Sequence, residues 1–543
     1  METRQGPYTQ RMLAVAESHP HLFRQDQSTW DGNEDSDEIT SAIAPLNPSS
    51  SVGPDGIPLP ALIAIGNTLT SPLCKIFTAI LELGHFPEPW KVSRVTVIAK
   101  PNKPSYNSLS SFRPISVVNS FARIFEKVVL GRLTWLSKKH DWFSNNQHGF
   151  LDGRSTETAA HSLISFVEKG FRSKECSATA FIAIKAAFDS AWPPALIDAL
   201  AKRHCPIYLT RIINSFLTNR SACFVFHESL LHKVDIGCPQ GSVLSPFLWA
   251  VSVDDAYRNL APQTLIVAYA DDITLIVKDK NPAHAVQKLQ AMCDAIISWF
   301  TDRMLEISPA KSVFMVFSRR PTILAATISL SLYLCSAALR PAIQTTYLGF
   351  LIDCRLSWLP HIAAQCTSAK RKIFACKRFL GLTWGLSANR LRSLYDLVIE
   401  PCLLYGCSLW YDRSRSKTVI AMLRSVQRLL NLLATRALST TSATSLNLLI
   451  NQLPIDYRTT ELAQAALYRI PTDKFALSTR AALSIHLPSH PPSIERPISI
   501  YLENHPPWNQ PQFPQTVILP KSPTIPLLPS EPGVLRLYTD GSV

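Results

Sequence analysis

Hydrophobic and polar positions divide the chain into stretches of different periodicity. Residues 41–132 have the pattern of short amphipathic helices followed by a strand-like run, VSRVTVIAK. Residues 157–300 alternate strand-like and helix-like runs, which is typical of a sheet layer combined with helices. Residues 364–467 keep a helical period. The sequence therefore predicts mixed helix and sheet first and a helical region afterwards.

Both ends of the chain depart from this periodicity. Residues 1–40 are polar and rich in acidic side chains, so we expect a weakly ordered lead-in. Thirteen prolines fall within residues 488–532, and that density blocks both helices and central strands. It predicts an extended linker. A new strand-like run, VLRLYTDGSV, follows it.

The strongest single motif is TLIVAYADDITLIV, residues 264–277. Two apolar, β-branched runs flank Asp271 and Asp272, which predicts a tight β-hairpin with two carboxylates at its tip. Adjacent carboxylates repel each other, and a cation relieves that repulsion. Oxygen ligands on a rigid tip suit Mg²⁺. An ordinary turn is the alternative, because Asp is common in turns.

Three other segments carry candidate chemistry. GCPQGSVLSP, residues 237–246, has the composition of a tight loop that opens a helix near Ser245. The run AFIAI is a predicted strand that turns into a helix. VIAKPNKP and SFRPIS place Lys100, Lys103 and Arg113 on a strand–loop–strand unit. Cations there can bind a triphosphate, with Arg as the bidentate partner; solvated surface charge is the alternative.

Composition favours a polyanionic partner. The 543 residues carry 54 Lys plus Arg against 40 Asp plus Glu, a net charge of +14, which suits nucleic acid or an acidic membrane surface. The 12 cysteines are widely spaced, with neither zinc spacing nor a disulfide framework, so we expect free thiols. METRQGPYTQ has no apolar signal sequence. We therefore expect an intracellular protein, cytoplasmic, nuclear or both.

One stretch without charged side chains raises the question of a membrane span. It covers residues 321–339, and its centre, ISLSLYL, alternates Ser with Leu. That alternation is the period of a strand. A membrane span would place each serine in hydrocarbon. We expect a buried or half-buried strand and no membrane partner.

Taken in order, the segments resemble the reverse transcriptase of non-LTR (LINE-type, jockey-like) retrotransposons. Nine segments carry this resemblance: SSSVGPDGIP, VIAKPNKP, SFRPISVVNSFARIFEKVV, QHGFLDGRST, FIAIKAAFDSAW, GCPQGSVLSP, AYADDITLIV, LEISPAKSVFMVF and YLGFLID. They cover about residues 45–355. The resemblance implies an RNA-directed DNA polymerase that uses an RNA template, a DNA primer and dNTPs. It also implies two Mg²⁺ ions, with Mn²⁺ as a possible substitute.

The resemblance assigns a role to each matching residue. Asp271 is implied as a metal ligand with Asp272 as its partner, and Lys311 lies where a lysine stands near the leaving pyrophosphate. Lys100 and Arg113 match the cations that bind the triphosphate. The remaining two nucleotide-site residues are Phe188, at the position of an aromatic gate against the ribose 2′-hydroxyl, and Gln240, a contact to nucleotide or template.

The implied fold is α+β, a polymerase right hand. We expect six regions: a lead-in (1–40), fingers (41–177), a palm with an antiparallel sheet (178–345), a basic helical thumb (346–470), a Pro-rich linker (471–534) and the start of an RNase H-like domain (535–543). Asp540 matches that domain's first metal-binding acid. We see no endonuclease-like segment and only nine RNase H-like residues, so we expect a fragment of a longer element protein.

One position departs from the family pattern. The strand before Phe188 carries Ala183 where the family has an aspartate that bridges both metal ions. Asp189, Asp254 and Asp255 are poor substitutes, and we expect them to be solvated or capping acids. Losing a bridging ligand costs more than the about 10–100-fold typical of a supporting residue.

Two hypotheses therefore stay open: a working polymerase, and a catalytically silent relic that keeps the fold and nucleic-acid binding. A viral RNA replicase would share two acids on a hairpin, but Phe188 and the LYTDGS segment argue against it. A group II intron maturase would carry a basic domain where the Pro-rich linker lies. Residue 183 alone separates the first two hypotheses.

Overall fold

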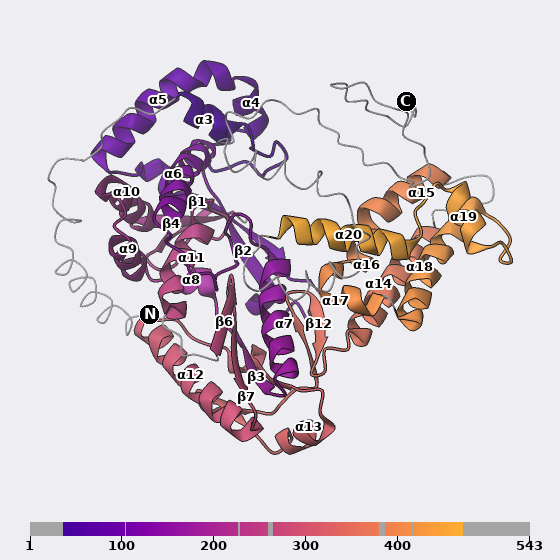
Figure 1. Cartoon of the computed structure of the whole chain (residues 1–543). Coiled ribbons are helices and arrows are strands. Elements are labelled where there is room, and N and C mark those ends of the chain that lie inside the picture. Colours follow the sequence, from indigo (N-terminus) through magenta and orange to yellow (C-terminus); the bar gives the residue numbers. More distant parts are fainter. Residues whose placement is uncertain are drawn as a thin grey trace, which may run out of the picture. The chain divides into compact units, whose positions relative to one another are not determined.

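The computed structural model describes residues 36–101, 103, 105–225, 229–258, 264–378, 386–414 and 416–470 (Figure 1). The predicted linker and RNase H-like start, with Asp540, lie outside these residues. The lead-in is described only from Ser36, where helix α3 (Ser36–Ile43) begins. Ile39, Ala42 and Ile43 repeat at helical spacing and are all buried, so residues 36–40 are helical rather than weakly ordered.

The central sheet has four antiparallel strands. They are β6 (Thr264–Tyr269), β7 (Asp272–Asp279), β3 (Cys176–Ala183) and β8 (Val313–Phe317), in that order. Strand side chains alternate between faces. On one face, Ala180, Ile182 and Leu275 join the hydrophobic core with buried side chains of helix α12 (Pro282–Asp302).

Helix α7 (Thr156–Arg172) covers the opposite face of this sheet (Figure 1). The ammonium of Lys278 lies 4.6 Å from the ring centroid of Phe166 on that helix. Lys278 has the same strand parity as Asp272, so Asp272 projects toward the α7 side of β7. The apolar composition of α7 and α12 thus buries both faces and leaves the strand ends accessible.

A second four-stranded sheet holds the candidate cations. Its order is β2 (Phe112–Val117), β1 (Val92–Ala99), β4 (Arg220–Val225) and β5 (Ser229–Val234). Strand β1 pairs antiparallel with β2 and parallel with β4. Residues 220–234 of the predicted palm therefore join the sheet of the predicted fingers. The division into fingers, palm and thumb at the stated boundaries stays a prediction.

Helices and short turns connect these strands. Those before the central sheet are α4 (Leu59–Ala64), α5 (Gly66–Leu83), η2 (Glu88–Lys91), η3 (Leu109–Ser111) and α6 (Ser120–Lys139). Those that follow β3 are α8 (Ala187–Ser190), α9 (Pro193–Lys202), α10 (Ile207–Leu217), α11 (Ser245–Asp254), η4 (Asp255–Tyr257) and η5 (Pro309–Lys311). Helix α11 begins at the predicted Ser245.

The stretch without charged side chains is not one strand. Its first part forms helix α13 (Pro321–Thr327), followed by the short hairpin of β9 (Leu332–Leu334) and β10 (Ala337–Leu339). Proline at the first helical position is already in a helical φ, so the expectation of a strand was wrong for residues 321–327. The end of the ISLSLYL run does form the expected strand, β9, with Leu332 and Leu334 buried. Among the described residues, no helix combines the length and the apolar character that crossing a bilayer requires.

The rest of the described chain is mostly helical. A hairpin of β11 (Gln344–Tyr347) and β12 (Phe350–Asp353) precedes it. The helices are α14 (Leu359–Lys377), α15 (Ala388–Leu394), the π-helix η6 (Tyr395–Ile399), α16 (Glu400–Leu403), α17 (Cys407–Ser414), α18 (Lys417–Thr435), α19 (Ala443–Leu449) and α20 (Ile455–Arg469). All 12 cysteines are free thiols, as predicted.

Candidate polymerase active site

The two predicted carboxylates lie at the tip of a hairpin. Strands β6 and β7 pair from Thr264–Val277 to Tyr269–Asp272, and only Ala270 and Asp271 form the loop. Ala270 has a φ of 57°, which lets the chain reverse in two residues. Asp271 and Asp272 are both exposed there. The predicted hairpin is confirmed.

The electrostatics of the tip favour a bound cation. The loss of water around its carboxylate raises the pKa of Asp272 to about 6, and the negative charge of Asp271 raises it further. The positive charge of Lys311 lowers it. A divalent ion stabilises the ionised form of a carboxylate whose pKa is raised beside a second acid. The pair therefore fits one such ion.

Position 183 lies directly across from this pair. Ala183 on β3 is the register partner of Asp272 on β7, so its methyl group occupies the place from which a third carboxylate would project. Its amide donates to Ser312 Oγ at 3.3 Å, and its carbonyl accepts from the Ser308 amide at 2.9 Å. In the described part of the chain, no three His, Cys, Asp or Glu side chains form a group that suits a metal ion. Among the described residues, the ligand set for two ions is therefore incomplete.

The acids considered as substitutes have other partners. Asp254 is fully buried and accepts hydrogen bonds from the Ser144 amide at 2.8 Å, Arg203 Nη2 at 3.3 Å and Arg258 Nε at 2.9 Å. Asp255 pairs with Arg203 at 2.7 Å. The expectation of a solvated or capping acid was wrong for Asp254, because it ties α11 to the 142–146 segment.

Asp189 stays on the surface, in the first turn of α8. Its pKa is raised by the loss of solvent around it, and the charge of Lys100 acts against this. The charged group that acts on Asp189 is therefore Lys100. Asp189 does not replace the carboxylate missing at position 183.

The predicted cations lie close enough for their charges to act on one another. Arg113 pairs with Ile98 in the β1–β2 register, and the Lys100 amide donates to the Ser111 carbonyl at 2.8 Å. The pKa of Lys100 is lowered, first by burial and next by the charges of Lys311, Lys103 and Arg113. The charge of Lys311 lowers the pKa of both Lys100 and Asp272, so these three side chains lie within electrostatic reach of one another.

Phe188 also lies beside the hairpin. Its half-buried ring is 5.9 Å from the rings of both Phe150 and Trp249. The Trp249 indole Nε1 donates to the carbonyl of Ala270 at 2.9 Å. Trp249 therefore links the Phe188 ring to the hairpin tip.

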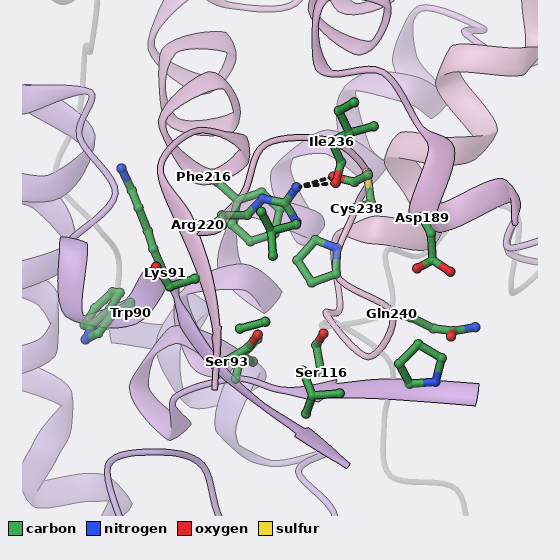
Figure 2. A pocket seen from close by; sticks show the side chains of 18 of the residues that line it. Trp90, Lys91, Ser93, Ser116, Asp189, Phe216, Arg220, Ile236, Cys238 and Gln240 are labelled. Atoms are coloured by element: carbon green, nitrogen blue, oxygen red, sulfur yellow. Dashed lines mark hydrogen bonds between the residues drawn. The ribbon is translucent and has the colours of Figure 1, made fainter. Parts of the chain in front are cut away.

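Gln240 lies on the loop between β5 and α11. Its carbonyl accepts from the Ser116 amide on β2 at 2.7 Å. Gln240, Asp189 and Cys238 line a cavity of ≈ 210 Å³ (Figure 2). The buried Arg220 guanidinium binds the start of this loop. It donates to the carbonyls of Ile236 and Gly237 at 3.1 and 2.5 Å.

Sequence reasoning missed two residues that support the site. Gly149 lies against the hairpin tip, where an added Cβ would stand 2.3 Å from the Ala270 nitrogen. The buried Glu126 on α6 accepts hydrogen bonds from the loop that carries Gln240. Both fall in quoted segments, QHGFLDGRST and SFRPISVVNSFARIFEKVV, but neither has a local pattern that reveals a distant partner.

Comparisons with known proteins agree with this geometry. Residues 98–352 match the family described as reverse transcriptase (RNA-dependent DNA polymerase). The probable RNA-directed DNA polymerase from transposon BS of Drosophila melanogaster is 29% identical over 70% of this chain and 42% of that protein. The RNA-directed DNA polymerase from mobile element jockey, from the same fly, is 28% identical over the same shares. The chain thus spans about two fifths of these relatives.

A solved structure shows a remote similarity. Apo telomerase from Candida tropicalis, truncated from the C-terminal domain, aligns with a TM-score of 0.34 and 14% identity, over 55% of this chain and 59% of that one. The fold assignment rests instead on the family match, the antiparallel central sheet and the helices around it. Residues 98–352 thus match the reverse transcriptase family, with a mixed helix and antiparallel-sheet architecture that agrees with a right-hand polymerase fold, and the chain is similar to the polymerases of Drosophila non-LTR retrotransposons.

Proposed function

We propose that this domain is an RNA-directed DNA polymerase that adds deoxynucleotides to a primer 3′-hydroxyl. The observation that supports the proposal is that the charge of Lys311 acts both on Asp272 of the hairpin tip and on Lys100, which also lies within reach of the charge of Arg113. Such a site can receive a triphosphate beside a metal-binding pair.

The chain's own residues have distinct tasks in this proposal. Lys100 and Arg113 neutralise the triphosphate, and Lys311 stabilises the charge that develops on the departing pyrophosphate. Phe188 excludes ribonucleotides by collision with the 2′-hydroxyl. Gln240 orients the nucleotide or the template. Since phosphoryl transfer depends on positioning and electrostatic stabilisation, these contacts account for most of what the protein supplies.

Asp271 and Asp272 are the residues that would hold Mg²⁺ or Mn²⁺. In a two-ion site, one divalent ion would activate the attacking hydroxyl and the other would stabilise the leaving group. Ala183 supplies no oxygen to a second ion from its side chain. We therefore propose that this copy is impaired, and a silent copy that still holds an RNA–DNA duplex is the second candidate.

Primer extension tests the proposal. The full chain is given poly(rA)/oligo(dT), dTTP and Mg²⁺ or Mn²⁺, and the natural protein is compared with Ala183→Asp. We expect Ala183→Asp to incorporate dTTP at least about 100-fold faster, more than a supporting residue would give. Ala183→Asn is the matched control, because it fills the same space without the charge.

Two outcomes would contradict parts of this proposal. If the natural protein already extends the primer and Asp271→Ala abolishes the activity, Ala183 is not what limits this copy. If Ala183→Asp is folded and binds the duplex but incorporates nothing, the site is not a polymerase site.

Three further parts of the proposal concern the wider protein. The basic helical region would hold the template–primer backbone, which makes RNA and DNA the macromolecular partners. The segment LYTDGS, with Asp540, would open an RNase H-like domain. We place the protein inside the cell, in the cytoplasm, the nucleus or both, which imaging of a tagged full-length chain tests directly.

A further inference from the structure

A buried carboxylate joins two segments far apart in the sequence. Glu126 on α6 has no exposed surface. Its Oε2 accepts hydrogen bonds from Ser242 Oγ at 2.6 Å and from the Val243 amide at 2.8 Å. Ser242 Oγ in turn accepts from the Leu244 amide at 3.1 Å. Glu126 therefore binds the end of the loop just before α11 begins.

The same loop is held from its other side by β2. The Ser116 amide donates to the Gln240 carbonyl at 2.7 Å, and the loop closes on itself through the Ser242 amide and the Pro239 carbonyl at 3.1 Å. Gly241 has a φ of 125°, and an added Cβ would lie 2.5 Å from the Ser116 carbonyl oxygen. Gln240 is thus fixed between β2 on one side and Glu126 on the other.

The charge of Glu126 has little local compensation. Arg123, one turn earlier on the same helix, is the charged residue that acts on it, and the loop contributes only neutral donors. Arg123 itself donates to the Ser51 carbonyl at 3.0 Å. The charge of Asp55 raises the pKa of Arg123, and the charge of Arg94 lowers it. Among the described residues, Glu126 Oε1 has no hydrogen-bond partner. A glutamine would accept the same two bonds without a buried charge.

An ionised acceptor nevertheless makes the stronger clamp. Hydrogen bonds to a carboxylate are roughly twice as strong as neutral ones. Burial raises the pKa of Glu126 to about 7, and the hydrogen bonds from Ser242 and Val243 oppose that rise. Above this pH the carboxylate is ionised and holds both donors. Below it, protonation weakens both bonds.

We propose that Glu126 is a positioning residue of the nucleotide site, which fixes the 237–244 loop and through it the place of Gln240. The proposal rests on the proposed function, because that function takes Gln240 to contact the nucleotide or template. Glu126 itself touches neither. It acts only through the loop.

Hydrogen exchange of the full chain tests the clamp without requiring activity. We compare the natural protein with Glu126→Gln, and use Glu400→Gln as a matched control, since Glu400 is a buried glutamate that pairs with Arg458 instead. At pH 8, Glu126→Gln should raise exchange in peptides covering 237–244 about 10-fold and leave β3 unchanged. Glu400→Gln should leave both unchanged.

The pH dependence separates a clamp from general packing. Because intrinsic exchange rates cancel in the ratio of variant to natural protein, that ratio should fall toward one as the pH drops from 8 to 6. An unchanged loop in Glu126→Gln overturns the proposal. Equal increases in the loop and in β3 also overturn it, since they show global destabilisation.

The catalytic arm uses the Ala183→Asp background. There, Glu126→Gln should raise the KM for dTTP about 10-fold with little change in kcat, while Glu400→Gln changes neither. If the background extends primers and Glu126→Gln does not alter KM, Glu126 is not a positioning residue and the polymerase assignment stands. If the background is inactive, the proposed function fails, and the exchange experiment still decides whether Glu126 holds the loop.

Discussion

At the scale of single residues, the site depends on where carboxylates stand. Asp271 and Asp272 share one hairpin tip, and the register of β3 and β7 puts Ala183 beside Asp272. The other acids near in sequence are engaged elsewhere, with Asp254 tied to two arginines. None of Asp189, Asp254 and Asp255 therefore replaces the carboxylate that is missing at Ala183.

Metal binding should depend on pH near the pKa of Asp272. Because that pKa is raised to about 6, the carboxylate is protonated below it and loses its affinity for a cation. We expect Mn²⁺ binding, followed by electron paramagnetic resonance, to weaken as the pH falls from 7 to 5. In Asp271→Asn the remaining carboxylate should titrate at lower pH, because its negative neighbour is gone. A midpoint that rises in Asp271→Asn would contradict this assignment.

Asp254 should matter for stability and not for metal. Removing one partner of a buried ion pair costs about 3–5 kcal/mol, because a charge is left uncompensated. We expect Asp254→Ala to lower the free energy of unfolding by that amount in urea. Asp255→Ala is the control and should cost about 1 kcal/mol, since this acid is half-buried and pairs with Arg203 at 2.7 Å and more distantly with Arg258 at 4.0 Å. A stable Asp254→Ala protein that fails to bind Mn²⁺ would reverse our interpretation.

At the scale of elements, the hairpin is supported along its length. The 146–149 segment runs beside β6, with the His148 amide donating to the Ala268 carbonyl at 2.8 Å and the Ala268 amide donating to Asn146 at 2.9 Å. The segment ends at Gly149, where backbone meets the tip. Two apolar strands alone make a marginal hairpin, so this neighbour contributes to holding the tip in place.

Gly149→Ala should displace the tip. Its Cβ would stand 2.3 Å from the Ala270 nitrogen, a backbone atom that moves only if the turn moves. We expect a loss of about 1–3 kcal/mol in the free energy of unfolding, typical of overpacking, together with weaker Mn²⁺ binding. Gly131→Ala is the control, because that helical position is open and alanine favours a helix. Equal stability of the two variants would show that the contact yields at little cost.

At the scale of the whole described chain, α7 connects the central sheet to the helical region. Ser408 Oγ on α17 donates to Glu157 Oε1 at 2.5 Å and contacts His161 Nε2 at 2.8 Å. The hydroxyls of Thr156, at the start of α7, and Tyr405, just before α17, lie 2.8 Å apart and connect the same two helices. The helices of the predicted thumb are thus fixed to the helix that covers the Asp272 face.

Nucleic-acid binding should be salt-dependent and independent of residue 183. Arg371 and Arg390 are exposed on α14 and α15. We expect Arg371→Ala to weaken binding of an RNA–DNA duplex and to lower the slope of log K against log salt by about 1, as the loss of one phosphate contact does. The control is Lys288→Ala, which removes a lysine paired with Asp279. Equal slopes for both variants would place the duplex elsewhere.

Sequence periodicity predicted the local elements well. The hairpin and the helical region after residue 358 follow from repeating apolar positions, and the start of α11 follows from the loop composition before it. Strand β1 was also predicted, although its second half, with Val97 and Ile98, is exposed. The predictions for residues 36–40 and 321–327 were wrong, because a short buried apolar stripe forms a helix in the first segment and a first-turn proline starts a helix in the second. Pairing between distant strands, such as β1 with β4, has no local signal and was not predicted.

The sequence by itself determined the carboxylate pair, the absence of a carboxylate at position 183 and the order of the motifs, because residue identity and local periodicity are properties of the chain alone. Only the tertiary structure decided that Ala183 faces Asp272, that the charge of Lys311 reaches both Lys100 and Asp272, and that Glu126 holds the Gln240 loop. Strand register sets the first of these relations and a buried hydrogen bond sets the third, in both cases between residues more than 80 positions apart, and no short stretch of sequence encodes them.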